Sequence, residues 1–375
     1  MKILTFVLLV IISFSSCNHK NLKSGVKPEA FHKLVNGKQV ELFVLTNKNG
    51  LEMTVTNYGG RIVSLMIPDK SGKMADIVLG YDNLDGYLNS NKKYFGASIG
   101  RYGNRIAKGL FTLDSLSYKL AINNGPNCLH GGVTGFSAKV WDAVLIKKNE
   151  LELTLVSPDM EEGFPGELKV LMNYRLTDDN EIAIYYSAKT NKPTVINLTN
   201  HTYFNLHGAG NGDILDLFLQ INADKYTPVD STLIPTGSIE SVTGTPFDFT
   251  SYKTIGSRIN DKNKQLEFGS GYDHNFVLNK ASGEPVSKAA SVFDPQSGRF
   301  MEVFTNEPGI QFNCGNYLDG KEIGKQNKQY NFRSALCLET QHFPDSPNHP
   351  EFPTVVLRPG QVYTSACVYK FSVKK

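Results

Sequence analysis

Apolar and polar residues alternate in many short segments of this chain. Leucine occupies every second position in residues 151–155, and similar alternation recurs in residues 181–186 and 361–369. Successive side chains of a β-strand point to opposite faces, and the Val, Ile, Thr, Tyr and Phe of these segments favour strands. Turn-forming pairs such as Asn49-Gly50 separate the segments. No long segment has the apolar spacing of an amphipathic helix, so the pattern predicts an all-β sandwich or barrel.

The first residues break this alternation. Lys2 precedes an almost unbroken apolar run over residues 3–14, and small residues then lead to Cys17. The run is well short of the ~20 residues that span a bilayer as a helix, and its layout is typical of a secretory signal. We therefore expect residues 1–16 to be a signal peptide and Cys17 to be a lipid anchor, as in a bacterial lipoprotein. The alternative is an ordinary signal cleaved near Ser16, with an incidental cysteine.

This N-terminus predicts an exported protein that is anchored to a membrane only by lipid and faces the periplasm or the cell surface. Residues 17–30 are polar and are typical of a spacer. Residues 31–375 contain no Pro/Ser-rich linker and no obvious repeat, so we expect them to form a single large β-domain. The sequence does not decide whether disulfides form, but no zinc-binding spacing occurs among the remaining cysteines, Cys128, Cys314, Cys337 and Cys367.

Charge and composition narrow the class of ligand. The chain has 39 Lys+Arg and 36 Asp+Glu, a net charge of +3, and 40% of its residues are apolar. This balance excludes an intrinsically disordered protein and argues against nucleic acid as a partner. The chain contains no P-loop, no GxGxxG after a strand and no HExxH, so we expect no nucleotide, redox or metal cofactor. The sequence leaves open whether the chain is a monomer or a dimer.

Glu339 ends an apolar run that has the composition of a buried strand. Burying a carboxylate is costly unless it is paired or hydrogen-bonded, and burial raises its pKa. A carboxyl group with a raised pKa is a candidate general base. The alternative is a buried salt bridge between Glu339 and an arginine.

His201 lies in a second polar segment, residues 194–206. If this segment is a strand, Asn197, Thr199, His201 and Tyr203 share one face. Three polar groups and a tyrosine on one face are unusual for a plain core, so we interpret the segment as part of a functional site. A solvated face is the alternative.

Two glycine-containing segments carry further candidates. Asn104 and Arg105 lie in residues 100–106, where arginine and amide groups can offer several donors to a polar ligand. His130 precedes two glycines, an arrangement that suits a tight turn facing a cleft. The alternatives are a surface turn with salt bridges for the first segment and a hydrogen-bonded loop histidine for the second.

Two more polar residues lie in later segments. Asp273 belongs to residues 271–278 and Gln311 to residues 307–312. Asp273 is suited to binding sugar hydroxyls or simply to capping a turn, and Gln311 is a candidate ligand contact.

Taken together in their order along the chain, the six segments resemble the aldose 1-epimerase (galactose mutarotase) family. The resemblance extends from about Val44 to Tyr369, and supporting stretches lie at residues 78–82, 233–237 and 244–249. Each stretch is weak alone, but their ordered combination is specific. The resemblance implies a large β-supersandwich fold, which agrees with the alternation described above.

The resemblance also implies roles for individual residues. Glu339, in Leu-Glu-Thr-Gln, matches the general base, and His201, in Thr-Asn-His-Thr-Tyr-Phe-Asn-Leu, matches the general acid. Further family positions that contact the sugar match Asn104, Arg105, His130, Asp273 and Gln311. Tyr203 is our additional candidate for stacking on the sugar.

The implied reaction interconverts the α and β anomers of free hexoses such as galactose and glucose. Ring opening needs a base for the C1 hydroxyl proton and an acid for the ring oxygen. We hypothesise that Glu339 takes the first proton while protonated His201 supplies the second, and that the roles reverse when the ring closes.

Two alternatives stay open at this point. A hexose-phosphate mutarotase on the same fold needs extra Arg or Lys at the phosphate end, and a non-catalytic, surface-tethered carbohydrate-binding protein needs neither acid nor base. A glycoside hydrolase is less consistent with the sequence, because it needs two carboxylates at the scissile bond.

Overall fold

The computed structural model describes residues 22–280 and 285–375. The predicted signal peptide and Cys17 therefore lie outside the described residues. Strands dominate the part that is described, and the two α-helices in it, α1 (Leu84–Asn89) and α2 (Lys264–Gly269), have six residues each. The prediction of an all-β protein is confirmed.

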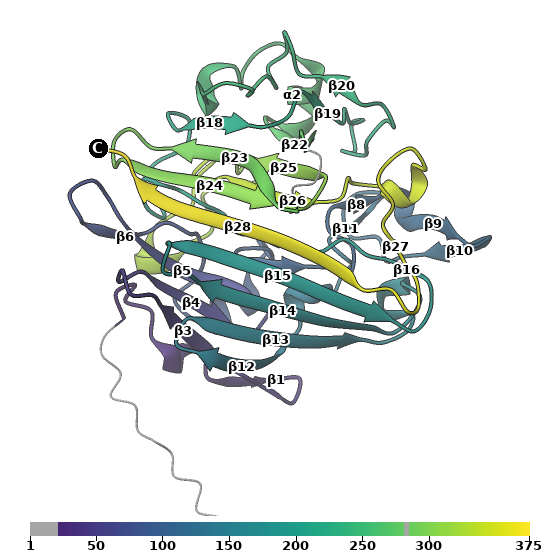
Figure 1. Cartoon of the computed structure of the whole chain (residues 1–375), viewed down its shortest axis with the longest axis horizontal. Helices are drawn as coiled ribbons and strands as arrows, with labels where there is room; N and C mark the ends of the chain where they lie inside the picture. Colours follow the sequence, from purple (N-terminus) through teal and green to yellow (C-terminus); the bar gives the residue numbers. More distant parts are fainter. Residues whose placement is uncertain (1–21, 281–284) are drawn as a thin grey trace, which may run out of the picture.

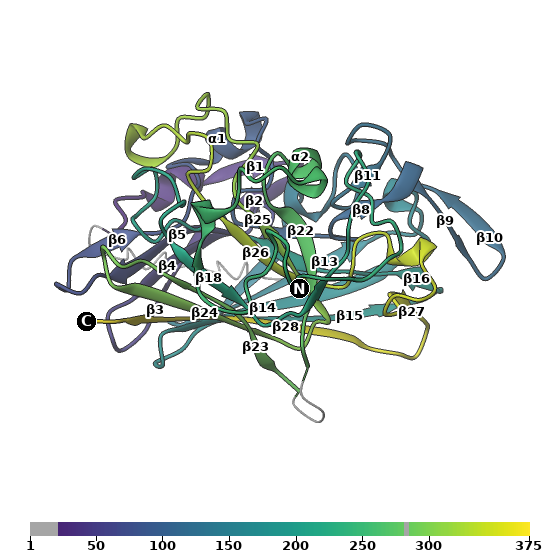
Figure 2. The same cartoon turned by 90° about the horizontal axis from the view of Figure 1, so that it is seen from above.

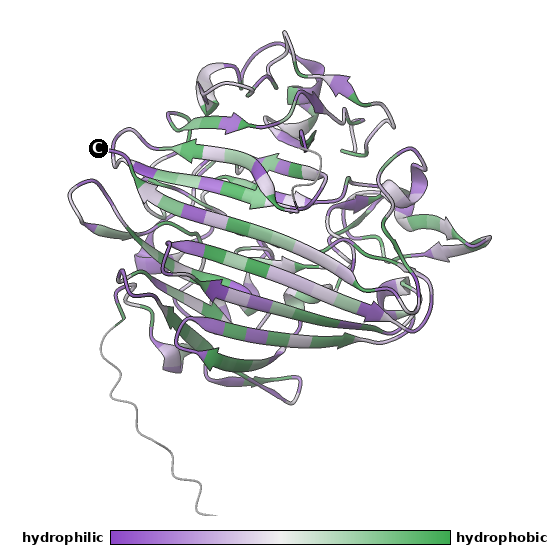
Figure 3. Ribbon diagram, viewed as in Figure 1, coloured by the Kyte–Doolittle hydropathy of each residue, from purple (hydrophilic) through white to green (hydrophobic). Residues whose placement is uncertain are grey.

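The largest element is a nine-stranded antiparallel sheet whose long strands run side by side in Figure 1. Leu151, Leu153 and Leu155 are buried on one face, as their alternation predicts, and apolar and polar bands alternate along these strands in Figure 3. In spatial order the strands are β12 (Asp142–Lys147), β13 (Glu150–Ser157), β14 (Leu168–Leu176), β15 (Glu181–Thr190), β28 (Tyr363–Val373), β24 (Arg299–Thr305), β23 (Ser287–Phe293), β18 (Phe218–Ile221) and β21 (Lys253–Thr254).

Two smaller sheets complete the layers. Figure 2 shows much of the remaining chain stacked on one side of the nine-stranded sheet. The five-stranded sheet has the order β20 (Glu240–Ser241), β19 (Lys225–Tyr226), β22 (Asp273–Val277), β25 (Gly309–Asn313) and β26 (Cys337–Gln341). The four-stranded sheet has the order β3 (Leu42–Thr46), β4 (Glu52–Thr56), β5 (Arg61–Pro68) and β6 (Met74–Asp76).

The remaining strands form short two-stranded pairs. Two of them carry candidate residues, namely β7 (Ala97–Ile99) with β17 (Thr199–His201), and β8 (Arg105–Ile106) with β11 (Cys128–Leu129). The others are β1 (Lys33–Val35) with β2 (Lys38–Val40), β9 (Leu110–Leu113) with β10 (Leu116–Lys119), and β16 (Thr194–Val195) with β27 (Val356–Leu357).

One hydrophobic cluster extends from Leu45 to Phe371 and includes buried residues of all three large sheets. Burial of this apolar surface is the main stabilising contribution to the fold. A second cluster includes Val26 and Phe31 together with Leu42 of β3 and Val63 of β5. The backbone N–H groups of Lys23 and Ser24 donate to the Glu52 carboxylate, both over 3.2 Å. Contact with the β-sheets thus begins before residue 31, where the sequence places the start of the domain.

Two further features bear on the sequence analysis. Cys128, Cys314, Cys337 and Cys367 are all buried free thiols. No helix among residues 22–280 and 285–375 is long and apolar enough to cross a membrane.

Candidate active site

The candidate residues surround one cavity of about 520 Å³. Its walls come from residues between Asn91 and Glu339 and from several sheets. They include every substrate-contacting residue expected from the sequence, namely Asn104, Arg105, His130, His201, Tyr203, Asp273, Gln311 and Glu339. The six segments that are separate in the sequence therefore meet at one place.

The register of the five-stranded sheet explains how three of these residues meet. Gln311 in β25 lies directly opposite Glu339 in β26, and Asp273 in β22 lies opposite Asn313 in β25. Because side chains at alternate positions share a face, these strands direct a row of polar groups towards the cavity. The Nε2 amide of Gln311 donates to Oδ1 of Asp273 over 2.8 Å. The side chains of Asp273 and Gln311 are thereby held in place before any ligand binds.

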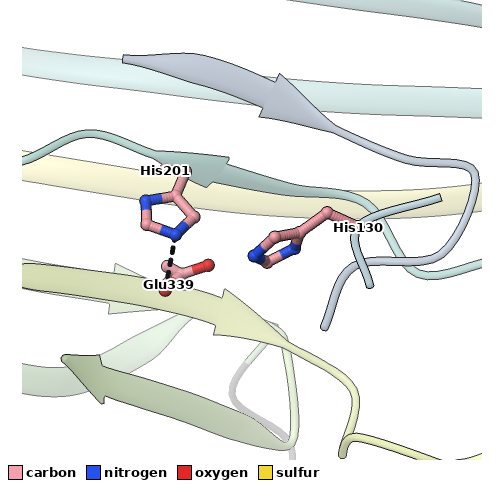
Figure 4. A group of neighbouring side chains, drawn as sticks. All are labelled: His130, His201 and Glu339. Carbon is pink, nitrogen blue, oxygen red and sulfur yellow. Dashed lines mark ion pairs between the residues drawn. The ribbon is translucent and has the colours of Figure 1, made fainter. Parts of the chain in front are cut away.

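His201 and Glu339 point towards one another from β17 and β26 (Figure 4). Nε2 of His201 lies 3.6 Å from Oε1 of Glu339, and the residues are only 5% and 2% exposed. The hypothesis of a buried salt bridge between Glu339 and an arginine is not supported, because among the described residues the ion-pair partner of Glu339 is this histidine. This distance is longer than a hydrogen bond, but the two groups are near enough for a proton to pass between them when the site tightens around a ligand.

Burial sets the protonation of this pair. It raises the pKa of Glu339 well above the ordinary value, and the nearby Asp273 charge adds to the effect while Arg105 opposes it. Burial lowers the pKa of His201 to about 4. In the sugar-free protein the lowered pKa leaves the His201 ring neutral at pH 7, and the raised pKa of Glu339 favours its protonated form. The reason is that water no longer stabilises either charged form.

His130 approaches the same pair from a separate loop (Figure 4). The backbone N–H of Asn104 donates to Nδ1 of His130 over 3.1 Å. A backbone N–H is only a donor, so Nδ1 must be unprotonated and the proton of the neutral ring lies on Nε2. Burial lowers the pKa of His130 well below its ordinary value, and His201 and Arg105 add to this shift. His130 is therefore a fixed neutral donor rather than a proton-exchanging acid.

The loop around His130 needs glycine for steric reasons. The φ angle of Gly131 is +83°, and a Cβ atom there would lie 2.0 Å from the carbonyl oxygen of Gly100. No other residue fits this close approach, which explains the glycine directly after His130.

The spacing of His130, His201 and Glu339 would allow a metal ion, since their potential ligand atoms lie within 4.8 Å of one another. A histidine that binds a metal normally donates its other ring N–H to an acceptor. His130 cannot do so through Nδ1, because that atom already accepts a hydrogen bond from Asn104. The three residues thus fit a metal ion poorly, and they fit a ligand with hydroxyl groups better.

The two arginines of residues 100–106 have different surroundings. Nε of Arg105 donates to Oδ1 of Asn124 over 3.1 Å, and the backbone N–H of Arg105 donates to Oδ1 of Asn104 over 3.0 Å, so this guanidinium is held at the cavity wall. Arg101 instead donates to backbone carbonyls, including those of Pro165 and Gly166, and supports the fold. Only Arg105 of the pair is available to a ligand.

Two buried oxygen atoms of the cavity residues lack a partner among the described residues. They are Oε2 of Glu339 and Oε1 of Gln311. An unpaired buried acceptor costs about 1–3 kcal/mol, so a ligand that donates a hydrogen bond to either atom removes this cost. Both are acceptors, which is the requirement for binding the hydroxyl protons of a sugar.

The polar face predicted for residues 194–206 is divided in the structure. His201 and Tyr203 line the cavity, whereas the Asn197 amide donates to the carbonyl oxygens of Gly103 and His342 over 3.0 and 3.2 Å. Asn197 is fully buried and serves the fold, since it joins three chain segments.

Aromatic rings surround His201. Tyr203 stacks on the imidazole with ring centroids 5.0 Å apart, and Tyr94 lies 5.7 Å from it on a nearly parallel plane. Tyr203, which the sequence analysis offered as a sugar platform, thus packs against His201 and also lines the cavity. Tyr94 and Tyr317, which also line the cavity, were missed, because a single aromatic residue in these segments carries no distinctive pattern. The Tyr317 hydroxyl donates to Oδ2 of Asp273 over 3.4 Å.

Comparisons with known proteins agree with this site. The sequence profile of the aldose 1-epimerase family matches residues 41–370. The chain is 48% identical to a galactose mutarotase of Bos taurus, over 89% of this chain and 94% of that protein. It is 39% identical to the aldose 1-epimerase of Escherichia coli (strain K12), over 90% and 96% of the two chains.

Solved structures show the same fold. An aldose epimerase homologue from C. elegans superimposes with a TM-score of 0.83 at 32% identity, over 90% of this chain and all of that chain. A galactose 1-epimerase from Lactobacillus acidophilus superimposes with a TM-score of 0.80 at 28% identity, over 92% and 97%.

Proposed function

This chain belongs to the aldose 1-epimerase family, and we infer from its active site that it interconverts the α and β anomers of free aldoses such as galactose and glucose. The observation that carries this inference is the buried His201–Glu339 pair. Both residues line the cavity, and Oε2 of Glu339 lacks a partner among the described residues. The pair holds one mobile proton, which is what ring opening and closure require.

Sugar binding prepares the pair for reaction. A hydroxyl proton donated to the unpaired Oε2 favours the carboxylate form of Glu339, and a ring oxygen that accepts from Nε2 favours the imidazolium form of His201. The proton that rests on Glu339 in the sugar-free protein therefore moves to His201 when the sugar is bound.

Ring opening then transfers two protons. The Glu339 carboxylate takes the proton of the C1 hydroxyl, the bond between C1 and the ring oxygen breaks, and Nε2 of His201 gives its proton to that oxygen. The open-chain aldehyde leaves Glu339 protonated and His201 neutral, which is the distribution of the sugar-free protein. Rotation about C1–C2 presents the other face of the carbonyl, and the reverse transfers close the ring as the other anomer.

The remaining residues orient the sugar. The Asp273–Gln311 hydrogen bond and the Arg105–Asn124 contact hold three side chains at fixed positions on the cavity wall. The neutral Nε2–H group of His130 is a further donor to a hydroxyl. Because these side chains are already fixed before the sugar binds, they align it for both proton transfers without a further loss of side-chain entropy.

The direct test is polarimetry of freshly dissolved α-anomers with a panel of free aldoses and one sugar 6-phosphate. We expect catalysed mutarotation of free hexoses. Faster catalysis of the sugar phosphate would support the hexose-phosphate alternative. Binding of hexose by calorimetry without any catalysed change of rotation would instead support a carbohydrate-binding protein.

We further propose that the protein is exported and anchored by lipid. The basis is the sequence alone, with residues 1–16 as signal peptide and Cys17 as the modified residue. In a bacterial host, the full-length chain should partition into the detergent phase and carry the added mass of a lipid, whereas Cys17→Ser should not. Equal partitioning of the two proteins would contradict the anchor.

A further inference from the structure

Cys337 contacts the ring nitrogen of His201 that the proposed chemistry does not use. Its Sγ atom lies 3.4 Å from Nδ1 of His201, and the cysteine is fully buried. Among the described residues this sulfur is the hydrogen-bonding neighbour of Nδ1.

The strand geometry of β26 explains the arrangement. Cys337 and Glu339 are two residues apart, so their side chains leave the same face of the strand. His201 on the neighbouring β17 therefore lies between them, with Nδ1 at the sulfur and Nε2 at the carboxyl. One strand thus contacts both nitrogens of the imidazole.

We propose that Cys337 is a positioning residue for the reaction: its sulfur accepts the Nδ1–H group of His201 and leaves Nε2 free to exchange a proton with Glu339 and the ring oxygen. This inference rests on the proposed function and adds a residue to its machinery. If the sulfur instead donated to Nδ1, the neutral ring would carry its proton on Nε2 and could not receive the proton of Glu339.

A thiol suits this position because it adds no negative charge. Burial raises the pKa of Cys337 well above its ordinary value, and the charges of Glu339 and Asp273 add to the shift, so the thiol stays protonated. A carboxylate at Nδ1 would stabilise the imidazolium and hold the proton that must pass to the sugar. The weak acceptor orients the ring while it leaves the proton mobile.

The tautomer can be measured without turnover. Nitrogen NMR of the sugar-free protein with labelled histidines separates the two neutral tautomers. The His201 signals are assigned as those that are lost in His201→Asn. We expect the Nδ1–H form in the wild-type protein. Detection of the Nε2–H form would overturn the proposal. Because the NMR measurement does not depend on catalysis, failure of this proposal is distinguishable from failure of the proposed function.

Kinetics of variants gives a second test. Loss of one hydrogen bond predicts about a 5- to 10-fold lower kcat for Cys337→Ala, with KM unchanged. Cys337→Ser keeps an acceptor and should recover kcat to within about threefold of wild type. Cys367→Ala is the matched control, since Cys367 is another buried free thiol, on β28.

The outcomes are separated by comparing the three variants. A selective loss of kcat in Cys337→Ala, recovered in Cys337→Ser, supports the positioning role. Equal losses in all three variants, or wild-type kcat in Cys337→Ala, would overturn it. Thermal unfolding of each variant shows whether the fold itself has changed.

Discussion

His201 and His207 are six residues apart but have opposite electrostatic surroundings. His201 faces a thiol at 3.4 Å and a carboxyl at 3.6 Å, and burial lowers its pKa to about 4. His207 lies between Asp294 and Asp216, with distances of 3.0 and 2.8 Å. Burial also lowers the pKa of His207, but the hydrogen bonds to both carboxylates outweigh it and raise the pKa above the ordinary value.

The two regions also differ in how completely their polar atoms are paired. Asp294 accepts from His207, from the Ser297 hydroxyl and from the backbone N–H of Gln296, and these bonds overcome burial and lower its pKa to about 2. Glu339 has an unpaired buried oxygen and a raised pKa. The difference teaches that a histidine–carboxylate pair stabilises the fold when it is fully hydrogen-bonded, and that incomplete pairing leaves a proton available for chemistry.

The largest expected effect follows from removing the carboxyl of the reactive pair. Glu339→Gln should lower kcat by ~10²–10⁴-fold, because one of the two proton-transferring groups is lost. The free energy of unfolding should stay within about 1 kcal/mol of wild type, since the amide fills the same space at an atom that already lacked a partner. Polarimetry and chemical denaturation measure the two quantities, and an unchanged kcat would contradict the assignment of Glu339.

Replacing the carboxylate that pairs with His207 should affect stability rather than activity. Asp294→Asn weakens a charged hydrogen-bond network and should lower the free energy of unfolding by about 1–3 kcal/mol. Its kcat should stay within about twofold of wild type, because Asp294 does not line the cavity. A large loss of activity at full stability would mean that the two regions are not separate in function.

A smaller effect tests the sugar contacts around the reactive pair. Gln311→Ala removes a buried amide that bonds Asp273, and should lower kcat/KM by about 5- to 10-fold, mainly through KM. Initial rates over a range of hexose concentrations separate the two parameters. A fall in kcat at constant KM would instead place Gln311 among the groups that act only in the transition state.

The smallest effect concerns the pH dependence of stability. The pKa of His207 is raised in the folded state. Its contribution to the free energy of unfolding is therefore fully present below the pKa of the unfolded chain, near 6.5, and is lost as the pH rises through the pKa of the folded state. The difference in unfolding free energy between wild type and His207→Gln should therefore be larger at pH 6 than at pH 9. Denaturation at both pH values measures it, and a difference that grows with pH would have the wrong sign.

Much of the fold and most of the site could be predicted from the sequence, for different physical reasons. Alternation at residues 151–155 predicts a strand locally, and the structure confirms it in β13. The order of the nine strands could not be predicted, because β28 pairs with β15 and β24 across long separations in the chain. The residues around the cavity were found from their ordered motifs and resemblance to a family.

What the sequence could not reveal is the electrostatic state of those residues. The lowered pKa of His201 in the sugar-free protein could not be predicted, because it depends on burial among Tyr94, Tyr203 and neighbouring strands. Likewise, the tautomer of His130 is set by one backbone N–H group of Asn104, and the role of Cys337 by its position opposite Nδ1. Such contacts appear only when distant segments are packed together.

The most direct test of the central claim is the pH dependence of kcat/KM for wild-type mutarotation, which reports the groups of the sugar-free protein. A pair that shares one proton is inactive when both groups are protonated and when neither is, so the profile should be bell-shaped. We predict that the acidic limb lies well below pH 6.5, towards the value of about 4 for His201. An acidic limb at or above pH 6.5 would contradict the account, because His201 would then hold its proton as His207 does.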